Sequence, residues 1–227
     1  MKIITSYQEF KEFRSTIESI SFVPTMGNLH KGHMALIDKA KSYDSHVSAS
    51  IFINPLQFND ASDFKNYPKS LDDDIALLSK HGCDSLFVPD SSILDNIKEI
   101  KAPDTALYLC GMNRPGHFDG VLTIVNKLFE ITKPTRSFFG KKDFQQLTLI
   151  KNFVIENNLP IEIISVDTVR ELNGLAMSSR NNRLSESDRE KASKLYETLS
   201  LIKDNSSNLS NEIIKSYKDE LTKKGFD

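Results

Sequence analysis

Short apolar runs alternate along this chain with segments of helical periodicity. The runs that have the length and composition of buried strands cover residues 20–24, 47–53, 85–88, 137–139 and 161–166. The clearest helical segments are 120–132, with one apolar stripe from Val121 to Phe129, and 144–156. Strands that alternate with helices favour a parallel sheet with helices on both faces. We therefore expect an α/β fold.

The pattern changes after about residue 169, because no strand pattern follows 161–166. A capping-box sequence at 185–188 precedes a helical stripe that runs from Ala192 to Ile202. A polar connector at 204–208 separates this stripe from a last apolar pattern between Ile213 and Leu221. We expect a larger domain over 1–168 and a small, mainly helical domain over 169–227.

Composition narrows the class of protein. A length of 227 residues suits one large α/β domain with a small appendage, and 39% hydrophobic with 26% charged residues is ordinary for a soluble protein. The net charge of -2 argues against a nucleic-acid partner, which usually requires a basic surface. Cys83 and Cys110 fit no metal or redox spacing, and no apolar run reaches membrane-spanning length. The first ten residues lack the apolar core of a signal peptide, so we expect a cytoplasmic protein.

The segment 24–33, PTMGNLHKGH, carries the most specific chemistry. It lies where the first predicted strand ends and the next helix begins, and ligands of open parallel sheets bind at that edge. A helix start can offer free N–H groups to a phosphate, while Gly27 and Gly32 let the backbone approach a ligand. His30 and His33 can donate hydrogen bonds to phosphate oxygens and stabilise attack at phosphorus. A pair of surface histidines in a loop is the alternative, but the position between strand and helix favours the functional interpretation.

Two further polar segments offer phosphate chemistry. FGKKDFQQ at 139–146 follows a strand and opens a helix, with lysines for the outer phosphates and an aspartate for Mg²⁺ or its water shell. Taken alone, it could also be a solvated helix-capping turn. MSSRN at 177–181 places two hydroxyls beside an arginine, which is typical of a phosphate clamp or of a polar hinge loop.

Two other segments are less specific. NPLQF at 54–58 follows the second strand and could supply amide groups to a small polar substrate. RPGHFDG at 114–120 precedes the most regular helix, and the sequence favours a helix-capping turn there.

Together these segments resemble the pantothenate synthetase, or pantoate–β-alanine ligase, family. The matching stretches are PTMGNLHKGH at 24–33, IFINPLQF at 51–58, RPGHFDG at 114–120, FFGKKDFQQL at 138–147 and LAMSSRN at 175–181. They occur in the family's order and spacing, and the resemblance covers about 20–183. Five motifs in register are highly specific, whereas HxGH alone marks a whole superfamily.

The resemblance implies a Rossmann-like domain with a smaller C-terminal lid, assembled as a homodimer. It also implies an enzyme that uses ATP with Mg²⁺ to adenylate (R)-pantoate, releases pyrophosphate, and then lets β-alanine expel AMP. By this resemblance His33, His30 and Lys142 would be catalytic. The implied ATP-binding residues are Met26, Gly27, Asn28, Leu29, His30, Lys31, Gly32, His33, Gly140, Lys141, Lys142, Asp143, Val169, Met177, Ser178, Ser179 and Arg180. The implied substrate-binding residues are Pro24, Thr25, Met26, Asn54, Gln57 and Gln146.

The sequence departs from the family pattern at two points. Lys141 stands where the family commonly has an acidic residue, so we expect extra positive charge beside the phosphates. The family's C-terminal domain normally continues beyond residue 227, so we expect a shortened lid.

Three other functions share some of these features. A related nucleotidylyltransferase has HxGH but does not need Gln57 and Gln146 as a substrate pair. A class I aminoacyl-tRNA synthetase fits less well, because the chain is short and slightly acidic. A nucleotide-binding regulator without catalysis is the non-enzymatic alternative.

Overall fold

The computed structural model describes residues 1–43, 45–208 and 210–226. Contacts between residues divide the chain into two compact units, Met1–Asp167 and Thr168–Asp227. The division falls one residue before the boundary expected from the sequence.

A six-stranded sheet forms the centre of the first unit, and every pair of neighbouring strands in it is parallel. The strand order is β1-β4-β3-β2-β5-β6. The strands are β1 (Lys2–Ile4), β2 (Ile20–Thr25), β3 (His46–Ile51), β4 (Ser85–Phe87), β5 (Arg136–Gly140) and β6 (Glu162–Val166). The last five confirm the expected strands. The sequence did not predict β1, an edge strand of three residues in which only Ile4 is buried.

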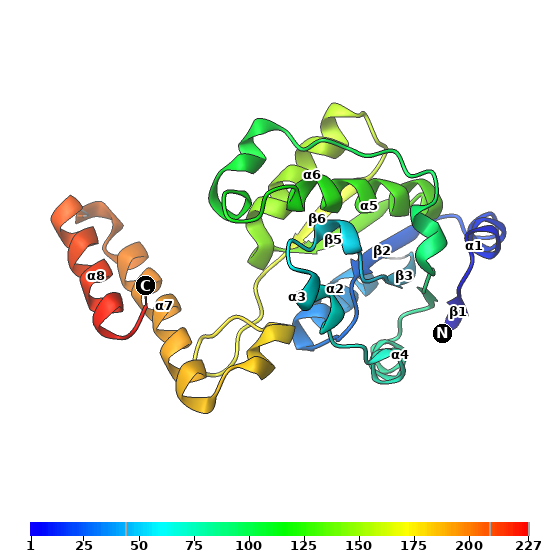
Figure 1. The fold of residues 1–227 in the computed structure, drawn as a ribbon. Coiled ribbons are helices and arrows are strands. Elements are labelled where there is room, and N and C mark those ends of the chain that lie inside the picture. The colour runs from blue at the N-terminus through cyan, green and yellow to red at the C-terminus, as the bar shows by residue number, and fades with distance from the viewer. Residues whose placement is uncertain (44, 209, 227) are drawn as a thin grey trace. The chain divides into compact units, whose positions relative to one another are not determined.

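Helices cover both faces of this sheet (Figure 1), as predicted. The α-helices of the unit are α1 (Tyr7–Arg14), α2 (Lys31–Lys41), α3 (Ala61–Lys65), α4 (Leu71–Lys80), α5 (His117–Thr132) and α6 (Phe144–Glu156). Successive side chains of β2 point to opposite faces. Phe22 therefore packs in the core formed with α1, α5 and α6, and Val23 packs in the core formed with α2 and α4.

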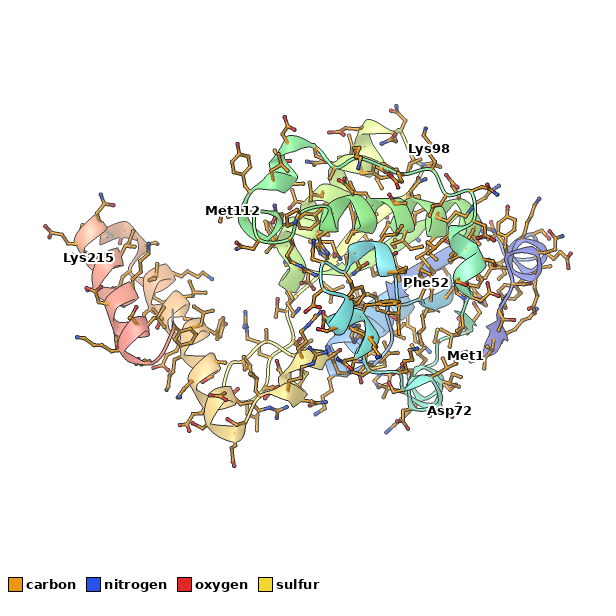
Figure 2. All side chains as sticks on the ribbon, in the orientation of Figure 1. Met1, Phe52, Asp72, Lys98, Met112 and Lys215 are labelled. Carbon is orange, nitrogen blue, oxygen red and sulfur yellow. The ribbon has the colours of Figure 1, made fainter. Side chains whose placement is uncertain are left out.

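Short 3-10 helices shape the connections of the first unit. They are η1 (Pro55–Gln57), η2 (Ser91–Leu94), η3 (Asp104–Leu107), η4 (Leu109–Gly111) and η5 (Lys141–Asp143). Figure 2 shows the contrast between interior and surface, because Phe52 packs against the core while Met112, just after η4, is 67% exposed.

The strand order places a topological switch between β2 and β5. From β2 the chain continues through α2 to β3 on one side of the sheet, and from β5 it continues through α6 to β6 on the other. Both strands are parallel, so their carboxyl ends lie at the same edge. Ligands of open α/β sheets bind at such a switch point. The fold therefore brings the segments that follow β2 and β5 to one place.

The second unit is mainly helical, in agreement with the sequence. It contains η6 (Ser179–Arg183), α7 (Glu186–Asp204), η7 (Ser206–Asn208) and α8 (Asn211–Lys223), and α7 lies beside α8 (Figure 1). The Ser185 hydroxyl caps α7 by accepting the N–H of Asp188 at 3.1 Å, as the capping-box sequence predicted. The only β pairing in the described part of this unit is an isolated antiparallel bridge between Arg170 and Ala176.

Candidate active site

The turn between β2 and α2 has an unusual backbone. Gly27 and Asn28 both have positive φ angles, of 80° and 50°. A Cβ on Gly27 would lie 3.0 Å from the Asp74 carboxylate and 3.1 Å from the Ile51 side chain. Glycine is favoured there both by the left-handed backbone and by the close packing.

The two histidines form a reciprocal cap at the start of α2. His30 is the N-cap residue, and its Nδ1 accepts the N–H of Gly32 at 3.1 Å. The Nδ1 of His33 accepts the N–H of His30 at 3.2 Å. A ring nitrogen that accepts a backbone N–H carries no proton, so the proton of each neutral ring is on Nε2. Each histidine can thus act as a hydrogen-bond donor through the atom away from the backbone.

The environment keeps both rings neutral at pH 7. Burial is the largest cause that lowers the pKa of His33, to about 3, followed by the nearby His30 and the Lys142 ammonium. Burial and then Lys142 also lower the pKa of His30. The ring centroids are 4.2 Å apart. The pair therefore combines two uncharged donors with one nearby cation, which suits binding of phosphate oxygens.

Three backbone amides between β2 and α2 donate to side chains within the protein. The N–H of Gly27 donates to the Thr25 hydroxyl at 3.2 Å, and those of Asn28 and Leu29 donate to the two oxygens of Asp74 at 2.9 and 2.7 Å. At the start of α2 itself, the N–H of Gly32 donates to Nδ1 of His30 and the N–H of His33 donates to the His30 carbonyl at 2.8 Å, so two of the amides expected to be free are used within the helix cap. The side-chain donors of this turn include Nε2 of His30 and of His33.

Asp74 is a residue of the site region that sequence reasoning missed. It lies on α4, is 2% exposed, and also accepts a hydrogen bond from the Ser70 hydroxyl at 3.3 Å. A signal was present in the sequence, because Asp74 precedes Leu78 by four residues and so shares its buried helix face. A carboxylate on an apolar face must find hydrogen-bond partners when it is buried.

The segment after β5 contributes Lys142. This lysine affects the pKa of both His30 and His33, so its ammonium group lies near the pair. It also contacts the neighbouring Asp143 carboxylate at 3.3 Å. Lys141, in contrast, pairs with Asp167 at 2.6 Å. The extra charge expected at Lys141 is therefore matched by a carboxylate, whereas Lys142 adds positive potential at the histidines.

The segment after β3 holds Gln57 in a defined orientation. The buried Asn54 accepts the N–H of Leu56 through Oδ1 at 3.2 Å and donates through Nδ2 to the carbonyl of Gly120 at 3.0 Å. These two backbone contacts establish the positions of Oδ1 and Nδ2 in the Asn54 side chain. Its Nδ2 also donates to Oε1 of Gln57 at 3.0 Å. The Gln57 amide therefore directs its NH₂ end away from Asn54, as a donor for an acceptor such as a carboxylate.

Other predicted residues of the first unit lie at the same sheet edge. Pro24 and Thr25 end β2, and the Thr25 hydroxyl donates to the carbonyl of Ser50 at 2.7 Å. Met26 directly follows β2, Lys31 and Gly32 lie between the two histidines, and Gly140 ends β5. Gln146 is half-buried in the first turn of α6.

In the second unit, the predicted nucleotide-binding residues lie in one loop. The N–H of Met177 donates to the carbonyl of Val169 at 3.0 Å, which brings these two together. The Ser178 hydroxyl caps η6 by accepting the N–H of Arg180 at 3.2 Å, and Ser179 is the first residue of η6. The buried Asn181 donates to Glu171 at 2.8 Å and to the carbonyl of Ala176 at 3.0 Å. The loop is therefore well connected within its own unit.

The described residues contain neither a metal-ligand cluster nor a helix suited to span a membrane. Across 1–43, 45–208 and 210–226, no three His, Cys, Asp or Glu side chains are grouped so as to hold a metal ion. Within the same ranges, no helix has both the length and the apolar character needed to cross a bilayer.

Comparison with known proteins gives one consistent family. The family described as Pantoate-beta-alanine ligase matches residues 2–227. A protein named pantothenate synthetase from Acinetobacter baylyi is 47% identical over 192 residues, which is 83% of this chain and 68% of that protein. A pantothenate synthetase from Shewanella piezotolerans is 45% identical over 217 residues, covering 92% and 77% of the two chains.

Solved structures agree with this family. Pantothenate synthetase from Thermus thermophilus has a TM-score of 0.89 and 38% identity, covering 98% of this chain and 82% of that one. The pantoate-beta-alanine ligase from Francisella tularensis has a TM-score of 0.85 and 42% identity, covering 96% and 85%. The latter structure is of a complex with beta-gamma ATP and beta-alanine.

Proposed function

The chain belongs to the pantoate–β-alanine ligase family, and we propose that it performs the family's reaction with the residues described above. It is an ATP-dependent ligase that condenses (R)-pantoate with β-alanine to pantothenate, a step of coenzyme A biosynthesis. The observation that carries the residue assignment is the meeting of two neutral histidines and Lys142 at the switch point between β2 and β5.

The first step is attack of a pantoate carboxylate oxygen on the α-phosphorus of ATP. The new P–O bond forms the acyl adenylate, and the bond to pyrophosphate breaks. Negative charge on the phosphate oxygens grows during this step, and fixed donors stabilise it without reorganisation. In this proposal His30 and His33 donate through Nε2, while Lys142 supplies positive charge.

The second step is attack of the β-alanine amine on the acyl carbon of the adenylate. The C–N bond forms, the bond between the acyl carbon and the phosphate oxygen of AMP breaks, and the proton that the amine loses passes to the departing phosphate or to water. No covalent bond to the protein is needed, because adenylation has already created the leaving group. Holding amine and adenylate in line can itself contribute about 7–11 kcal/mol in the best cases.

We propose that Gln57 and Gln146 bind pantoate. The support for Gln57 is the orientation that Asn54 imposes, since it directs an NH₂ group outward. The buried Asn54 acts in this proposal through Gln57. Pro24, Thr25 and Met26 complete the substrate-binding set at the end of β2.

The nucleotide-binding set in the proposal has two parts. One part is the turn from Met26 to His33 with the segment from Gly140 to Asp143, including Lys141. The other part is the loop of the second unit with Val169, Met177, Ser178, Ser179 and Arg180. Support for the second part is its internal order, because the Met177 amide and the Asn181 side chain hold its backbone.

Mg²⁺ fits this site as an ion that arrives with ATP. The described side chains form no three-ligand metal cluster, so phosphate oxygens and water would complete its coordination. Asp143 is the carboxylate of the segment after β5 that could bind the ion's water shell, and it is 62% exposed. When bound, the ion neutralises charge on the phosphates and helps pyrophosphate to leave.

We also propose a cytoplasmic homodimer that binds neither nucleic acid nor membrane. The dimer follows from the family resemblance, and the slightly acidic composition supports the absence of a nucleic-acid partner. Sedimentation velocity tests the dimer directly: a single species at the mass of one chain would contradict it.

Pyrophosphate release from ATP tests the reaction. We expect release that depends on (R)-pantoate, and AMP with pantothenate once β-alanine is added. Release that is indifferent to pantoate would instead indicate a nucleotidylyltransferase, and ATP binding without turnover would indicate a regulator.

A further inference from the structure

The RPGHFDG segment at 114–120 forms the start of α5. Its N-cap residue is Gly116, with a φ of 75°, so the cap residue itself has no side chain that could accept a hydrogen bond. The Asp119 carboxylate instead accepts the N–H of Ala102 at 2.9 Å and pairs with Lys101 at 3.0 Å. The segment forms the turn at the start of α5, as the sequence predicted, and the Asp119 side chain is directed at a neighbouring segment.

His117 forms a hydrogen bond with the backbone of Gln57. It is the first residue of α5, is 5% exposed, and its Nδ1 donates to the backbone carbonyl of Gln57 at 2.7 Å. A carbonyl can only accept, so Nδ1 must carry the proton. The bond is part-buried, so loss of the donor would cost more than loss of a fully exposed hydrogen bond.

Gly120 makes a second contact between α5 and the same turn. A Cβ on Gly120 would lie 2.2 Å from the carbonyl oxygen of Leu56 and 2.8 Å from the backbone nitrogen of Gln57. The carbonyl of Gly120 also accepts from Asn54, which orients the Gln57 amide. The backbones of α5 and η1 therefore touch directly, and no larger residue fits without moving η1.

From these contacts we infer that His117 is a positioning residue for Gln57. His117 fixes the backbone of the η1 turn, Gly120 sets its distance from α5, and Asn54 sets the direction of the Gln57 amide. The inference rests on the proposed function, in which Gln57 binds pantoate. It assigns the segment 114–120 to the pantoate half of the site, whereas the histidine pair of α2 serves ATP.

This role can be tested with substitutions of His117 that move or remove the hydrogen-bond donor to the Gln57 carbonyl. Asn can place its amide nitrogen near the position of Nδ1, Gln places it farther out, and Phe has no donor. For His117→Phe we expect kcat/KM for pantoate to fall about tenfold, the usual scale for one lost hydrogen bond inside a protein. His117→Asn should recover most of this loss and His117→Gln less. Affinity for an α,β-methylene analogue of ATP should change less than about twofold, because the Nδ1 of His117 donates to the η1 turn, which the proposal assigns to pantoate.

Two further measurements distinguish a positioning role of His117 from a general effect on the stability of the fold. Thermal unfolding is recorded for every variant, and His81→Asn serves as the matched control because His81 pairs with Asp38 at the end of α4. A purely structural role would lower stability and weaken ATP and pantoate together. If His117→Phe does not fold, the comparison of Asn with Gln carries the test.

The outcomes separate the inference from the function on which it rests. Wild-type protein that fails to make pantothenate would overturn the proposed function. Active wild-type protein with unchanged pantoate kinetics in His117→Phe, or with equal kinetics in the Asn and Gln variants, would overturn only the positioning role.

Discussion

The Nδ1 atom of His33 accepts the backbone N–H of His30 at 3.2 Å. This one bond fixes the tautomer of the His33 ring and ties the ring to the residue that begins α2. Since His30 is held in the same way by Gly32, two donors are oriented before any ligand binds. Preorganised donors of this kind lower the barrier because they need not reorient during the reaction.

Removal of the His33 donor should impair adenylation and spare the fold. We expect His33→Ala to lower the single-turnover rate of adenylate formation by about 10²–10³, the range for loss of one preorganised donor. His33→Gln should retain part of the rate, because its amide nitrogen can approach the position of Nε2. Rapid-quench measurement of adenylate checks this, with His81→Ala as control. A near-normal rate in His33→Ala would remove His33 from the catalytic set.

Acid should destabilise the protein in part through His33. Its folded pKa of about 3 is below the unfolded value of 6.5, so the unfolded chain binds more protons between these two values. The stability contribution is complete above pH 6.5 and is lost progressively as pH falls toward 3. Between pH 7.5 and 5 the loss should be at most about 2 kcal/mol, since one pKa unit corresponds to about 1.4 kcal/mol. Urea unfolding at both pH values should show a smaller loss in His33→Gln than in wild type.

The positive charge of Lys142 should have a measurable effect on the pKa values of His30 and His33. Lys142 lowers the pKa of His30 and of His33, so Lys142→Met should raise the pKa of both rings. NMR titration of the ring protons measures the shift. Lys141→Met is the matched control, because Lys141 pairs with the exposed Asp167. Equal shifts in the two variants would contradict the distinct roles of the two lysines.

Asp74 should hold the phosphate-binding turn in place. Asp74→Asn keeps the shape of the side chain but leaves one of the Asn28 and Leu29 amides facing an NH₂ group. The free energy of unfolding should fall by about 1–3 kcal/mol, the cost of an unsatisfied buried group, and ATP affinity should weaken. The exposed Asp72 on the same helix, labelled in Figure 2, provides the control variant Asp72→Asn. Urea unfolding and calorimetric ATP binding separate the two variants.

Hydrophobic periodicity was sufficient to predict most of the fold. The stripe from Val121 to Phe129 and the apolar strands are repeated local patterns, and burial of those side chains decides the architecture. The edge strand β1 was missed because three residues with one buried side chain carry no period. The family was also predictable, because five motifs in register are specific to it, and the comparisons confirm it.

The sequence by itself determined the fold class, the family and the residue types that the chemistry needs. Only the tertiary structure decided which of their atoms are available. Asp74 accepts hydrogen bonds from the amides of Asn28 and Leu29, which are 46 and 45 residues away in the sequence. His117 donates to the carbonyl of Gln57, which is 60 residues away. Such contacts depend on how α4 and α5 pack against the sheet. The local pattern of apolar and polar residues in the sequence does not specify that packing. For the same reason His30 and His33 were recognisable as donors from the sequence, while their tautomers and lowered pKa values follow from burial and neighbours in space.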